Sequence, residues 1–579
     1  MPPRSGSATT AAALVGAQVA LESFGMAPDG GWLVFALREV YRGRYRSHLW
    51  RVPWAGGIPQ RLTAGAVRDG SPAISPDGRW IAFRRSGTEN DAKPGQVWLM
   101  PASGGRARRV TRLRHGAATP CWSPDGTQLA VLGPAGPHRF LVGREVAGRA
   151  PTARRITRTD FRDDIEGHLS RRAHLWLVDP FGDSPARQLT SGDFDVAHPA
   201  WAPDGSWLAF DCDVSPDANI RPRSVVRRVA TDSGAVSELA SLPGDAWRPA
   251  VSPDGRRVAF IGVEEEDWPD AALPRLWVVP VEGGAPRCLT PGLDRPVACD
   301  VWADLLQAEE SPGPAWRSDH ELVVIVADTG RNLPYRVGLP GGDPEPLVGR
   351  DERVVAAGIA SAAGRVAIAA ALDRRGGDLM AVEEGALRRL TDAGARWQRR
   401  FGVPDWEERW VATVAGPMQV WVASPADASG PLPTILHLHG GPIGGFAPGG
   451  SMDSTLLCAH GYRVVMPNLR GSASFGAAWT GALGGDWGGV DAADVLRTVD
   501  AMIEAGLADP YRLGVMGLSY GGFLTQWLIG VTDRFGAAVA ENGVTNQASE
   551  WASSYFGIHY NRRARLGDPL TEAGMRQLW

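Results

Sequence analysis

The stretch that decides the fold reads Ser75-Pro76-Asp77-Gly78-Arg79-Trp80-Ile81-Ala82-Phe83, a turn sequence followed at once by a short apolar strand. Proline fixes one backbone dihedral and Asp-Gly favours a tight turn, so the chain reverses its direction just before this strand. The same combination recurs along the first part of the chain, and seven copies can be counted. They begin at Ala27, Ser75, Ser123, Ala202 and Ser252, with two degenerate copies at Arg317 and Ala362.

A second pattern keeps phase with these turns. Leu49-Trp50 is followed by Gly56-Gly57 and then by Leu62-Thr63, and similar series begin at Val97, Leu175, Leu276 and, in a weaker form, Leu379. Each repeat is about 48 residues long and has room for four short strands with one apolar face each. A single unit cannot bury both of its faces, whereas a closed ring of units can. The sequence therefore predicts a seven-bladed β-propeller over residues 1–400, with an ordinary β-sandwich as the alternative.

An insertion interrupts the regular spacing of the repeats. The third and fourth turn sequences are farther apart than their neighbours, and the extra residues include a segment rich in Arg and Asp at 154–172. Insertions of this kind lie on the rim of a propeller, where they face either a substrate cavity or solvent. Both placements stay open from the sequence.

Beyond residue 400 the pattern changes to alternating strands and helices. Two strand-like runs and a linker at 425–433 come first, followed by apolar strands expected at 435–438, 462–466, 512–516 and 537–540. Helices are expected at 492–505 and from 521 onward. This alternation is typical of a parallel sheet covered by helices, so 401–579 is predicted to be an α/β domain.

A glycine-flanked serine lies where one expected strand passes into a helix. Gly517-Leu518-Ser519-Tyr520-Gly521 has the form G-x-S-x-G. Between a strand and a helix this pattern indicates a nucleophile elbow, in which a tight turn lifts the serine hydroxyl above the sheet of an α/β-hydrolase. We expect Ser519 to be the nucleophile and Gly517 and Gly521 to give room for the turn. The alternative is a purely structural turn.

A second glycine-rich loop, His439-Gly440-Gly441-Pro442, follows the strand expected at 435–438. Glycines let the backbone approach a substrate carbonyl, so an exposed N–H here can donate to the tetrahedral oxyanion. We expect the N–H groups of Gly441 and Tyr520 to form the oxyanion hole. His439 precedes the serine, whereas this fold orders its triad as serine, acid and histidine. We therefore interpret His439 as organising the loop rather than as the base.

The composition argues against several classes of function. A net charge of −4 over 579 residues, with scattered arginines, gives no surface for nucleic acid. No run of about 18 apolar residues is present, so no membrane span is expected. The five cysteines are widely spaced and lack a CxxC pair, which favours a cytoplasmic location and indicates neither a disulfide framework nor a zinc site. We expect no metal and no cofactor.

In combination, four motifs resemble the prolyl-oligopeptidase family of serine peptidases. They are the HGGP loop, the segment 468–472, Gly485-Asp486-Trp487-Gly488 with Asp491 and Asp494, and the elbow at 517–522. The HGGP loop and the segment 171–178 are more similar to the acylaminoacyl-peptidase and dipeptidyl-peptidase branch. The resemblance covers nearly the whole chain, and it implies hydrolysis of short peptides or of N-terminally blocked residues through an acyl-enzyme.

The resemblance also implies roles for single residues. Glu541 and Asn542 match a segment beside the substrate pocket of the family, and Arg470 matches a family position compatible with the pocket or with a structural role. Asp486 and Asp494 are expected to form buried ion pairs or helix caps. The acidic run 264–267 either binds a free amino terminus, as in dipeptidyl peptidases, or is a solvated loop.

The acid and the histidine of the triad are not evident. After the nucleophile, Asp533 precedes the last expected strand and His559 precedes Asp568, the reverse of the required order. The chain is therefore expected to be incomplete at its C-terminus and to have little or no peptidase activity alone. Two other functions stay open: a non-catalytic propeller that binds a peptide or protein, and an esterase of the same fold. Whether the protein is a homo-oligomer is also open.

Overall fold

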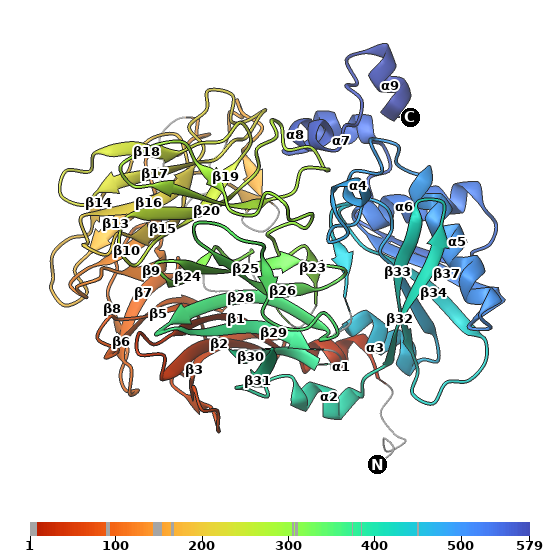
Figure 1. Ribbon diagram of the computed structural model, residues 1–579, viewed down its shortest axis with the longest axis horizontal. Coiled ribbons are helices and arrows are strands. Elements are labelled where there is room, and N and C mark those ends of the chain that lie inside the picture. The colour runs from red at the N-terminus through yellow and green to blue at the C-terminus, as the bar shows by residue number, and fades with distance from the viewer. Residues whose placement is uncertain are drawn as a thin grey trace.

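A β-rich unit and an α/β unit lie side by side in the computed structural model (Figure 1). The structure describes residues 9–88, 93–142, 153–163, 167–303, 306, 311–372, 375–383, 385–447 and 451–578. The chain forms the β-rich unit first, from red through yellow to green, and then the α/β unit in cyan and blue.

The β-rich unit consists of antiparallel groups of four strands, and seven such groups follow one another within its described residues. The first three are β1 (Val19–Met26), β2 (Trp32–Tyr41), β3 (Arg44–Pro53) and β4 (Gln60–Arg61); β5 (Val67–Ile74), β6 (Trp80–Gly87), β7 (Gln96–Pro101) and β8 (Arg108–Arg109); and β9 (Ala118–Trp122), β10 (Leu129–Ala135), β13 (Arg172–Val178) and β14 (Arg187–Gln188). The small hairpin β11 (Arg162–Asp163) and β12 (Gly167–His168) lies in the insertion of the third group.

The remaining four groups repeat the same topology. They are β15 (Val196–Trp201), β16 (Trp207–Cys212), β17 (Val225–Ala230) and β18 (Val236–Ala240); β19 (Ala246–Val251), β20 (Arg257–Gly262), β21 (Arg275–Pro280) and β22 (Arg287–Cys288); β24 (Ala315–Ser318), β25 (Glu321–Ala327), β26 (Asn332–Gly338) and β27 (Glu345–Pro346); and β28 (Val354–Ala362), β29 (Arg365–Leu372), β30 (Arg375–Glu383) and β31 (Ala386–Arg389). The last group meets the first, because Arg365 and Arg388 donate hydrogen bonds to the carbonyls of Gly30 and Trp54 at 2.8 and 3.0 Å. The groups therefore close into a ring.

The two repeated sequence patterns each have a local physical cause. In the turn, the Ser75 hydroxyl donates to Asp77 at 2.5 Å and accepts from the N–H of Trp80 at 2.9 Å, which sets the start of the next strand. In the Leu-Thr pattern, the Thr63 hydroxyl accepts from the N–H of Leu49 at 2.9 Å. The same bond recurs at Thr111, Thr190, Thr290 and Thr391. Each repeat thus satisfies the same buried backbone donor in the same way.

Tryptophans join neighbouring groups. The indole N–H of Trp122 donates to the carbonyl of Ala73 in the preceding group at 3.0 Å, and Trp201 does the same to Cys121 at 3.0 Å. Trp316 repeats the bond to Ala250. These bonds connect the first strand of one group to the first strand of the group before it, so they hold neighbouring groups of the ring together.

The α/β unit is built on one six-stranded sheet in the order β32-β33-β36-β34-β37-β38. Its strands are β32 (Asp405–Thr413), β33 (Gly416–Ser424), β34 (Leu432–Leu438), β36 (Arg463–Pro467), β37 (Ala508–Leu518) and β38 (Ala537–Glu541). The first two pairings in this order are antiparallel and the other three are parallel. Each strand predicted in this half is present, and each observed strand includes residues beyond the predicted bounds.

Helix α3 (Met452–Ala459) packs on one face of this sheet, and α5 (Val490–Glu504) and α6 (Tyr520–Val531) pack on the other. The short helix α4 (Ala477–Thr480) precedes α5 in the chain. Helices α7 (Gln547–Ser553), α8 (Gly557–Arg563) and α9 (Glu572–Leu578) follow β38 and lie away from the sheet (Figure 1). Val422 and Val465 pack toward α5 and α6, whereas their neighbours Ala423 and Val464 pack toward α3. This alternation follows from the two-residue period of a strand.

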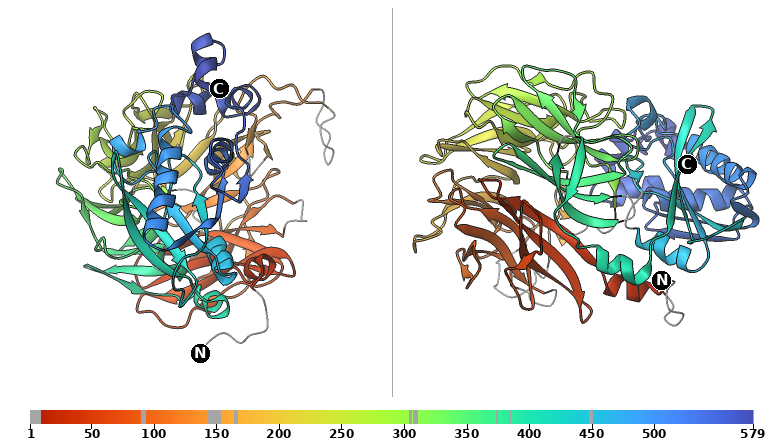
Figure 2. Two further views of the ribbon diagram at one scale, coloured as in Figure 1. Left: turned by 90° about the vertical axis from the view of Figure 1, so that its right-hand side faces the viewer. Right: turned by 60° about the horizontal axis from the view of Figure 1, so that its bottom comes forward.

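Segments from both ends of the ring bind the two units together. The N-terminal helix α1 (Ala11–Gly16) packs on α2 (Ala395–Phe401), where the indole of Trp397 donates to the carbonyl of Leu14 at 3.2 Å. Both helices lie at the seam between the units (Figure 2). The strand β23 (Val301–Trp302) pairs in parallel with β35 (Gly445–Phe446) of the α/β unit, and Arg331 forms an ion pair with Glu408 at 2.7 Å.

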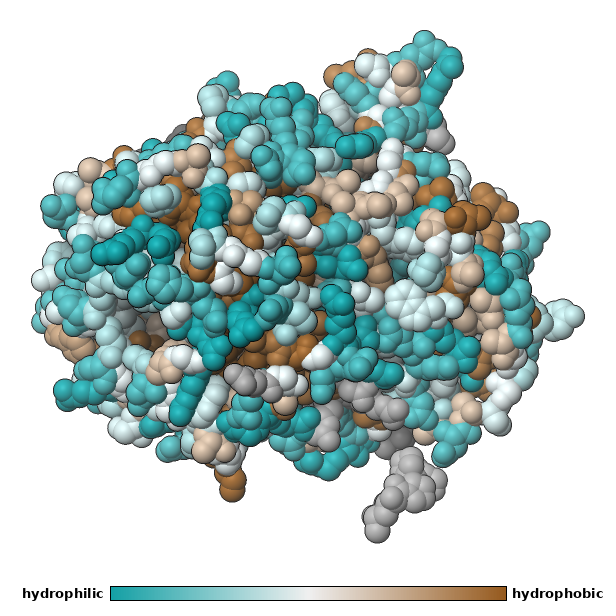
Figure 3. Space-filling view, in the orientation of Figure 1, coloured by the Kyte–Doolittle hydropathy of each residue, from teal (hydrophilic) through white to brown (hydrophobic). Residues whose placement is uncertain are grey.

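The surface of the molecule is mixed in character. In Figure 3, hydrophilic residues cover most of the visible face and hydrophobic residues form smaller groups between them. Within the residues that the structure describes, no helix has both the length and the apolar character needed to cross a membrane.

Candidate active site

Ser519 lies in the turn between β37 and α6, where its backbone has φ 57° and ψ −116°. A positive φ is uncommon for a residue with a side chain and costs conformational energy. The turn is held by two backbone bonds: the N–H of Ser519 donates to the carbonyl of Glu541, and its carbonyl accepts from Phe523, both at 2.9 Å. The side chain is exposed. This is the geometry of a nucleophile elbow.

The glycines around this turn are required by space. A Cβ added to Gly517 would meet the carbonyl oxygen of Gly521, and one added to Gly521 would meet that of Leu438. At Gly522 it would lie 2.5 Å from the carbonyl oxygen of Glu541. All three collisions are with backbone, which cannot move aside as a flexible side chain can. The predicted need for glycine at 517 and 521 is thus explained by contacts with β34 and α6.

The HGGP loop lies directly beside the elbow. A Cβ at Gly440 would lie 3.6 Å from the Cβ of Ser519. The carbonyl of Gly440 accepts from Nδ1 of His439 at 2.7 Å, which fixes the peptide plane that also contains the Gly441 N–H. Because the N–H and C=O of a trans peptide point in opposite directions, the Gly441 N–H is directed away from His439. It donates to no acceptor among the described residues.

His439 itself is buried and neutral. Only 5% of its surface is exposed, and Nε2 lies 2.8 Å from the hydroxyl of Ser472. Burial lowers the pKa of His439 to about 4. Both ring nitrogens are engaged, Nδ1 within the loop and Nε2 with Ser472, in agreement with the interpretation that this histidine organises the loop rather than acting as a base.

Tyr520 is the first residue of α6, so its N–H is one of the helix donors without a partner inside the helix. Its ring is held by Asp491, which accepts the phenol hydrogen bond at 2.5 Å and also accepts from the N–H of Gly488 at 2.8 Å. Burial raises the pKa of Asp491, and burial together with the nearby carboxylate raises that of Tyr520. The phenol therefore stays protonated as the donor. Sequence reasoning did not identify this contact, which joins residues 29 positions apart.

Arg470 is placed in the interior. Its guanidinium binds both oxygens of Asp494 at 2.9 and 2.7 Å and donates to the carbonyl of Val490 at 3.0 Å. Arg470 is 9% exposed and Asp494 1%. The predicted buried ion pair is therefore present at Asp494. Neither role predicted for Asp486, a buried ion pair or a helix cap, is observed: this exposed residue has no ion pair among the described residues, and the N-cap of α5 is Gly489, without a side-chain hydrogen bond. Asp491 is the acid that turns inward.

Glu541 and Asn542, which the family resemblance places beside the substrate pocket, lie next to the elbow. Glu541 ends β38 and accepts the backbone N–H of Ser519, and Asn542 continues with φ 48°. Both side chains are exposed. They lie next to the nucleophile turn without contributing side-chain contacts to it.

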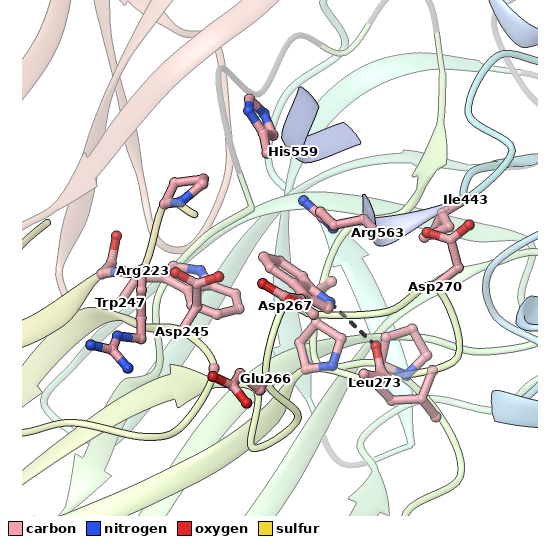
Figure 4. A pocket seen from close by; sticks show the side chains of 18 of the residues that line it. Arg223, Asp245, Trp247, Glu266, Asp267, Asp270, Leu273, Ile443, His559 and Arg563 are labelled. Carbon is pink, nitrogen blue, oxygen red and sulfur yellow. Dashed lines mark hydrogen bonds between the residues drawn. The ribbon is translucent and has the colours of Figure 1, made fainter. Parts of the chain in front are cut away.

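A cavity of about 760 Å³ lies between the two units (Figure 4). From the β-rich unit it is lined by Asp245, Trp247 and Asp270 among others, and from the α/β unit by residues that include Ile443, His559 and Arg563. Ile443 follows the HGGP loop directly, so the cavity reaches that loop, although Ser519 is not among its lining residues. Its volume suits a small ligand or a short peptide.

The wall of the cavity holds charges of both signs. Burial raises the pKa of Asp245, Asp270 and Asp300 to about 6 and lowers the pKa of Arg563. The Arg563 guanidinium lies over the ring of Trp268, 4.1 Å from its centroid. Of the acidic run 264–267, Glu266 and Asp267 line the cavity, and Asp267 forms an ion pair with Arg562 at 2.6 Å.

Among the described residues, no hydrogen bond joins the Ser519 hydroxyl to a histidine or a carboxylate. His559 lines the cavity, where burial lowers its pKa, and Asp568 accepts from the N–H of Leu570.

The insertion segment that the structure describes is held by Arg172, which binds Asp160, Asp193 and Asp195. Part of that insertion, 164–166, lies outside the described residues.

A serine at a glycine-flanked strand–helix turn, above a largely parallel sheet and beside a loop with a free N–H, defines the class of α/β-hydrolases. Residues 450–572 match the prolyl oligopeptidase family. An uncharacterized peptidase of Bacillus subtilis is 31% identical over 408 residues, which cover 69% of this chain and 62% of the relative. Dipeptidyl-peptidase 5 of Porphyromonas gingivalis is 27% identical over 61% of this chain and 51% of its own length.

A solved structure agrees with these matches. The uncomplexed acylaminoacyl peptidase of Pyrococcus horikoshii superposes with a TM-score of 0.77 at 17% identity, covering 97% of this chain and 83% of that one. The likeness shows that the two share a fold. The family match over residues 450–572 agrees with the resemblance that the motifs indicated. It spans between half and two thirds of the length of the two curated relatives named above.

Proposed function

We propose that the protein is a serine peptidase that hydrolyses short peptides or N-terminally blocked residues through an acyl-enzyme on Ser519. The observation that carries this proposal is the exposed Ser519 at the strand–helix turn, with Gly440 of the HGGP loop directly beside it. The N–H groups of Gly441 and Tyr520 are the proposed oxyanion donors. The named relatives, which are peptidases, support the choice of reaction. They favour a peptidase over the esterase and the non-catalytic binding module.

In the proposed reaction the Ser519 oxygen forms a bond to the substrate carbonyl carbon, and the carbonyl electrons move to oxygen. The resulting oxyanion accepts from Gly441 and Tyr520, whose donors are preorganised by His439 and Asp491. Collapse of the intermediate expels the amine and leaves the acyl-enzyme, which water then hydrolyses. Glu541 and Asn542, exposed beside the elbow, are proposed to contact substrate, whereas the contacts of Arg470 favour its structural role.

The attacking hydroxyl must lose its proton to a base. Because no hydrogen bond joins the Ser519 hydroxyl to a base among the described residues, we propose that these 579 residues alone turn over peptides on the order of 10⁴-fold or more slowly than a complete triad. A hydrolase assay with N-acetylated and free dipeptide anilides tests this. Turnover within tenfold of an intact family peptidase would contradict it.

Covalent labelling tests the nucleophile without requiring turnover. A fluorophosphonate incubated at high concentration for hours should modify Ser519 in the folded protein, and mass spectrometry of the peptide spanning 512–525 should locate the adduct. The Ser519→Ala variant and the unfolded chain should stay unlabelled. Equal labelling of the variant, or modification of another residue, would contradict the proposal.

Three further proposals concern the whole molecule. The seven strand groups are proposed to be the seven blades of a propeller at 1–400, with 401–579 as the hydrolase domain. The cavity between them is proposed to admit short peptides only. A cytoplasmic location is supported by five free thiols, of which burial raises the pKa of Cys121 to about 11 and that of Cys212 to about 12.

A further inference from the structure

One loop of the β-rich unit contacts the α/β unit close to the HGGP loop. This propeller loop, residues 264–273, contacts the short helix α8 at three points. Asp267 pairs with Arg562 at 2.6 Å, the Trp268 ring lies under the guanidinium of Arg563 at 4.1 Å, and the N–H of Asp270 donates to the carbonyl of Arg563 at 3.3 Å. Together the three contacts fix α8 against the fifth strand group.

The propeller loop is itself held in a conformation that needs support. Asp267 and Trp268 have φ values of 61° and 39°, so two successive residues with side chains occupy the left-handed region. Such a conformation persists only where surrounding contacts determine it, and it is concentrated at functional positions. Trp268 is anchored by stacking on Trp247 of β19, with ring centroids 5.0 Å apart. Both strained residues contact α8.

The other end of this chain of contacts is the HGGP loop. Tyr560 lies three residues before Arg563, on the same side of α8. Its hydroxyl, on a half-buried side chain, donates to the carbonyl of Gly441 at 2.6 Å. Trp487 packs edge-on against Tyr560 and Tyr520, with centroids 6.0 and 5.0 Å away. Trp487 from the segment before α5, Tyr560 from α8 and Tyr520 from the start of α6 therefore form one aromatic cluster. This cluster connects the two proposed oxyanion donors, because it includes Tyr520 and binds Gly441 through Tyr560.

We propose that the propeller loop positions the oxyanion hole of the α/β unit: Asp267 and Trp268 hold α8, and Tyr560 on α8 holds Gly441. The inference rests on the proposed function only in giving Gly441 its role as a donor. It makes Asp267, Trp268 and Tyr560 positioning residues rather than catalytic ones. A separation of the two units at this seam would release the Gly441 carbonyl and loosen the adjoining peptide that bears the Gly441 N–H, so the oxyanion hole is complete only while the units are closed on each other.

Hydrogen exchange measured by mass spectrometry tests this coupling on the whole chain and needs no catalysis. Tyr560→Phe removes one hydrogen bond and should raise exchange in the peptide 438–446 about fivefold, with 264–273 unchanged. Asp267→Arg places like charges together and should raise exchange in 557–566 and also, at least twofold, in 438–446, which it does not touch. The reciprocal double variant Asp267→Arg/Arg562→Asp should restore both.

Glu264→Arg is the matched control, because it makes the same charge change in the same acidic run, at an exposed side chain that makes no contact with α8. It should leave 438–446 unchanged. The proposal is overturned if Asp267→Arg alters only 264–273 and 557–566, or if the double variant fails to restore 438–446. The rate of fluorophosphonate labelling at Ser519 should fall in Asp267→Arg and recover in the double variant. Absence of labelling in the wild type would count against the proposed function and not against the measured coupling.

Discussion

The turn at Ser75–Gly78 and the turn at Ser519 both reverse the chain sharply, and they do so in opposite ways. In the first turn, the positive φ of 70° falls on Gly78, which adopts this conformation without strain. The hydrogen bond from Ser75 to Asp77 that holds this turn is local. In the second, the positive φ falls on Ser519, and the flanking glycines serve to make room for distant backbone. The first turn is self-contained, whereas the second is held in place by the surrounding tertiary structure.

The two turns differ in the source of their stability, which is local contacts in one and distant tertiary contacts in the other. Turns like Ser75–Gly78 recur along the β-rich unit because a few neighbouring residues suffice to form each one. The elbow and the HGGP loop depend on buried partners far away in sequence, among them Asp491 and Ser472, and Asp494 holds Arg470 in the neighbouring segment 468–472. Perturbing a distant partner should therefore affect the site strongly, and perturbing a repeat should have a modest effect.

The largest effect is expected from breaking the buried ion pair. Arg470→Met leaves the Asp494 carboxylate buried without its partner and should lower the free energy of unfolding by about 3 to 5 kcal/mol. Arg497→Met is the matched control, because the Arg497–Glu504 pair is 39% and 64% exposed, and it should leave the free energy of unfolding nearly unchanged. Urea denaturation measures both. Similar losses in the two variants would mean that burial does not distinguish these pairs.

Acid should destabilise the site through His439. Its folded pKa of about 4 lies below the ordinary value of 6.5, so the unfolded state takes up a proton first as the pH falls. The contribution of this histidine to stability is therefore lost between about pH 6.5 and pH 4 and amounts to about 3 kcal/mol. His439→Asn cannot protonate and should lack this part of the pH dependence. Parallel stability curves for variant and wild type over that window would contradict the assignment.

The elbow glycine should be more sensitive than a glycine in the same helix. Gly521→Ala directs a Cβ at the backbone of β34 and should cost about 2 kcal/mol or more. Gly530, also in α6, has no atom within 4 Å of a Cβ, so Gly530→Ala should be neutral or stabilise by about 0.5 kcal/mol. Thermal unfolding of the two variants compares them directly, and equal shifts would remove the spatial explanation.

Within the ring, the repeated threonine bond should have a smaller effect. Thr290→Val keeps the shape but leaves the N–H of Leu276 without its acceptor, at a cost of about 1 to 2 kcal/mol. Thr290→Ser keeps the hydroxyl and should recover most of that loss. If Ser is no better than Val, the methyl group rather than the hydrogen bond explains the repeated Leu-Thr pattern.

The smallest effects should have opposite signs in the two turns. Ser519→Gly relieves the backbone strain of the elbow and should stabilise the folded protein by about 1 kcal/mol, while abolishing labelling. Gly78→Ala meets no atom within 4 Å, but it places a side chain at positive φ and should destabilise by about 1 kcal/mol. A destabilising Ser519→Gly would show that the elbow is not strained.

Local patterns could be predicted from the sequence, and distant partners could not. The strand groups followed from turn sequences that determine their own conformation, and the elbow followed from glycines adjacent to Ser519. Helix α6 begins at Tyr520, one residue before the predicted start, because the elbow turn leads directly into the helix. The spacing of Asp486, Asp491 and Asp494 did not reveal which acids turn inward. The contact of Tyr560 with Gly441 joins residues 119 positions apart and has no sequence signal.

The most direct test of the central claim is a structure of the protein with a phosphonate or peptide boronate bound to Ser519. We predict that the adduct oxygen lies about 2.7 to 3.1 Å from both the Gly441 and the Tyr520 nitrogen atoms, with the ligand entering the cavity between the two units. An adduct oxygen directed into solvent, beyond hydrogen-bond reach of both nitrogens, would contradict the proposed active site.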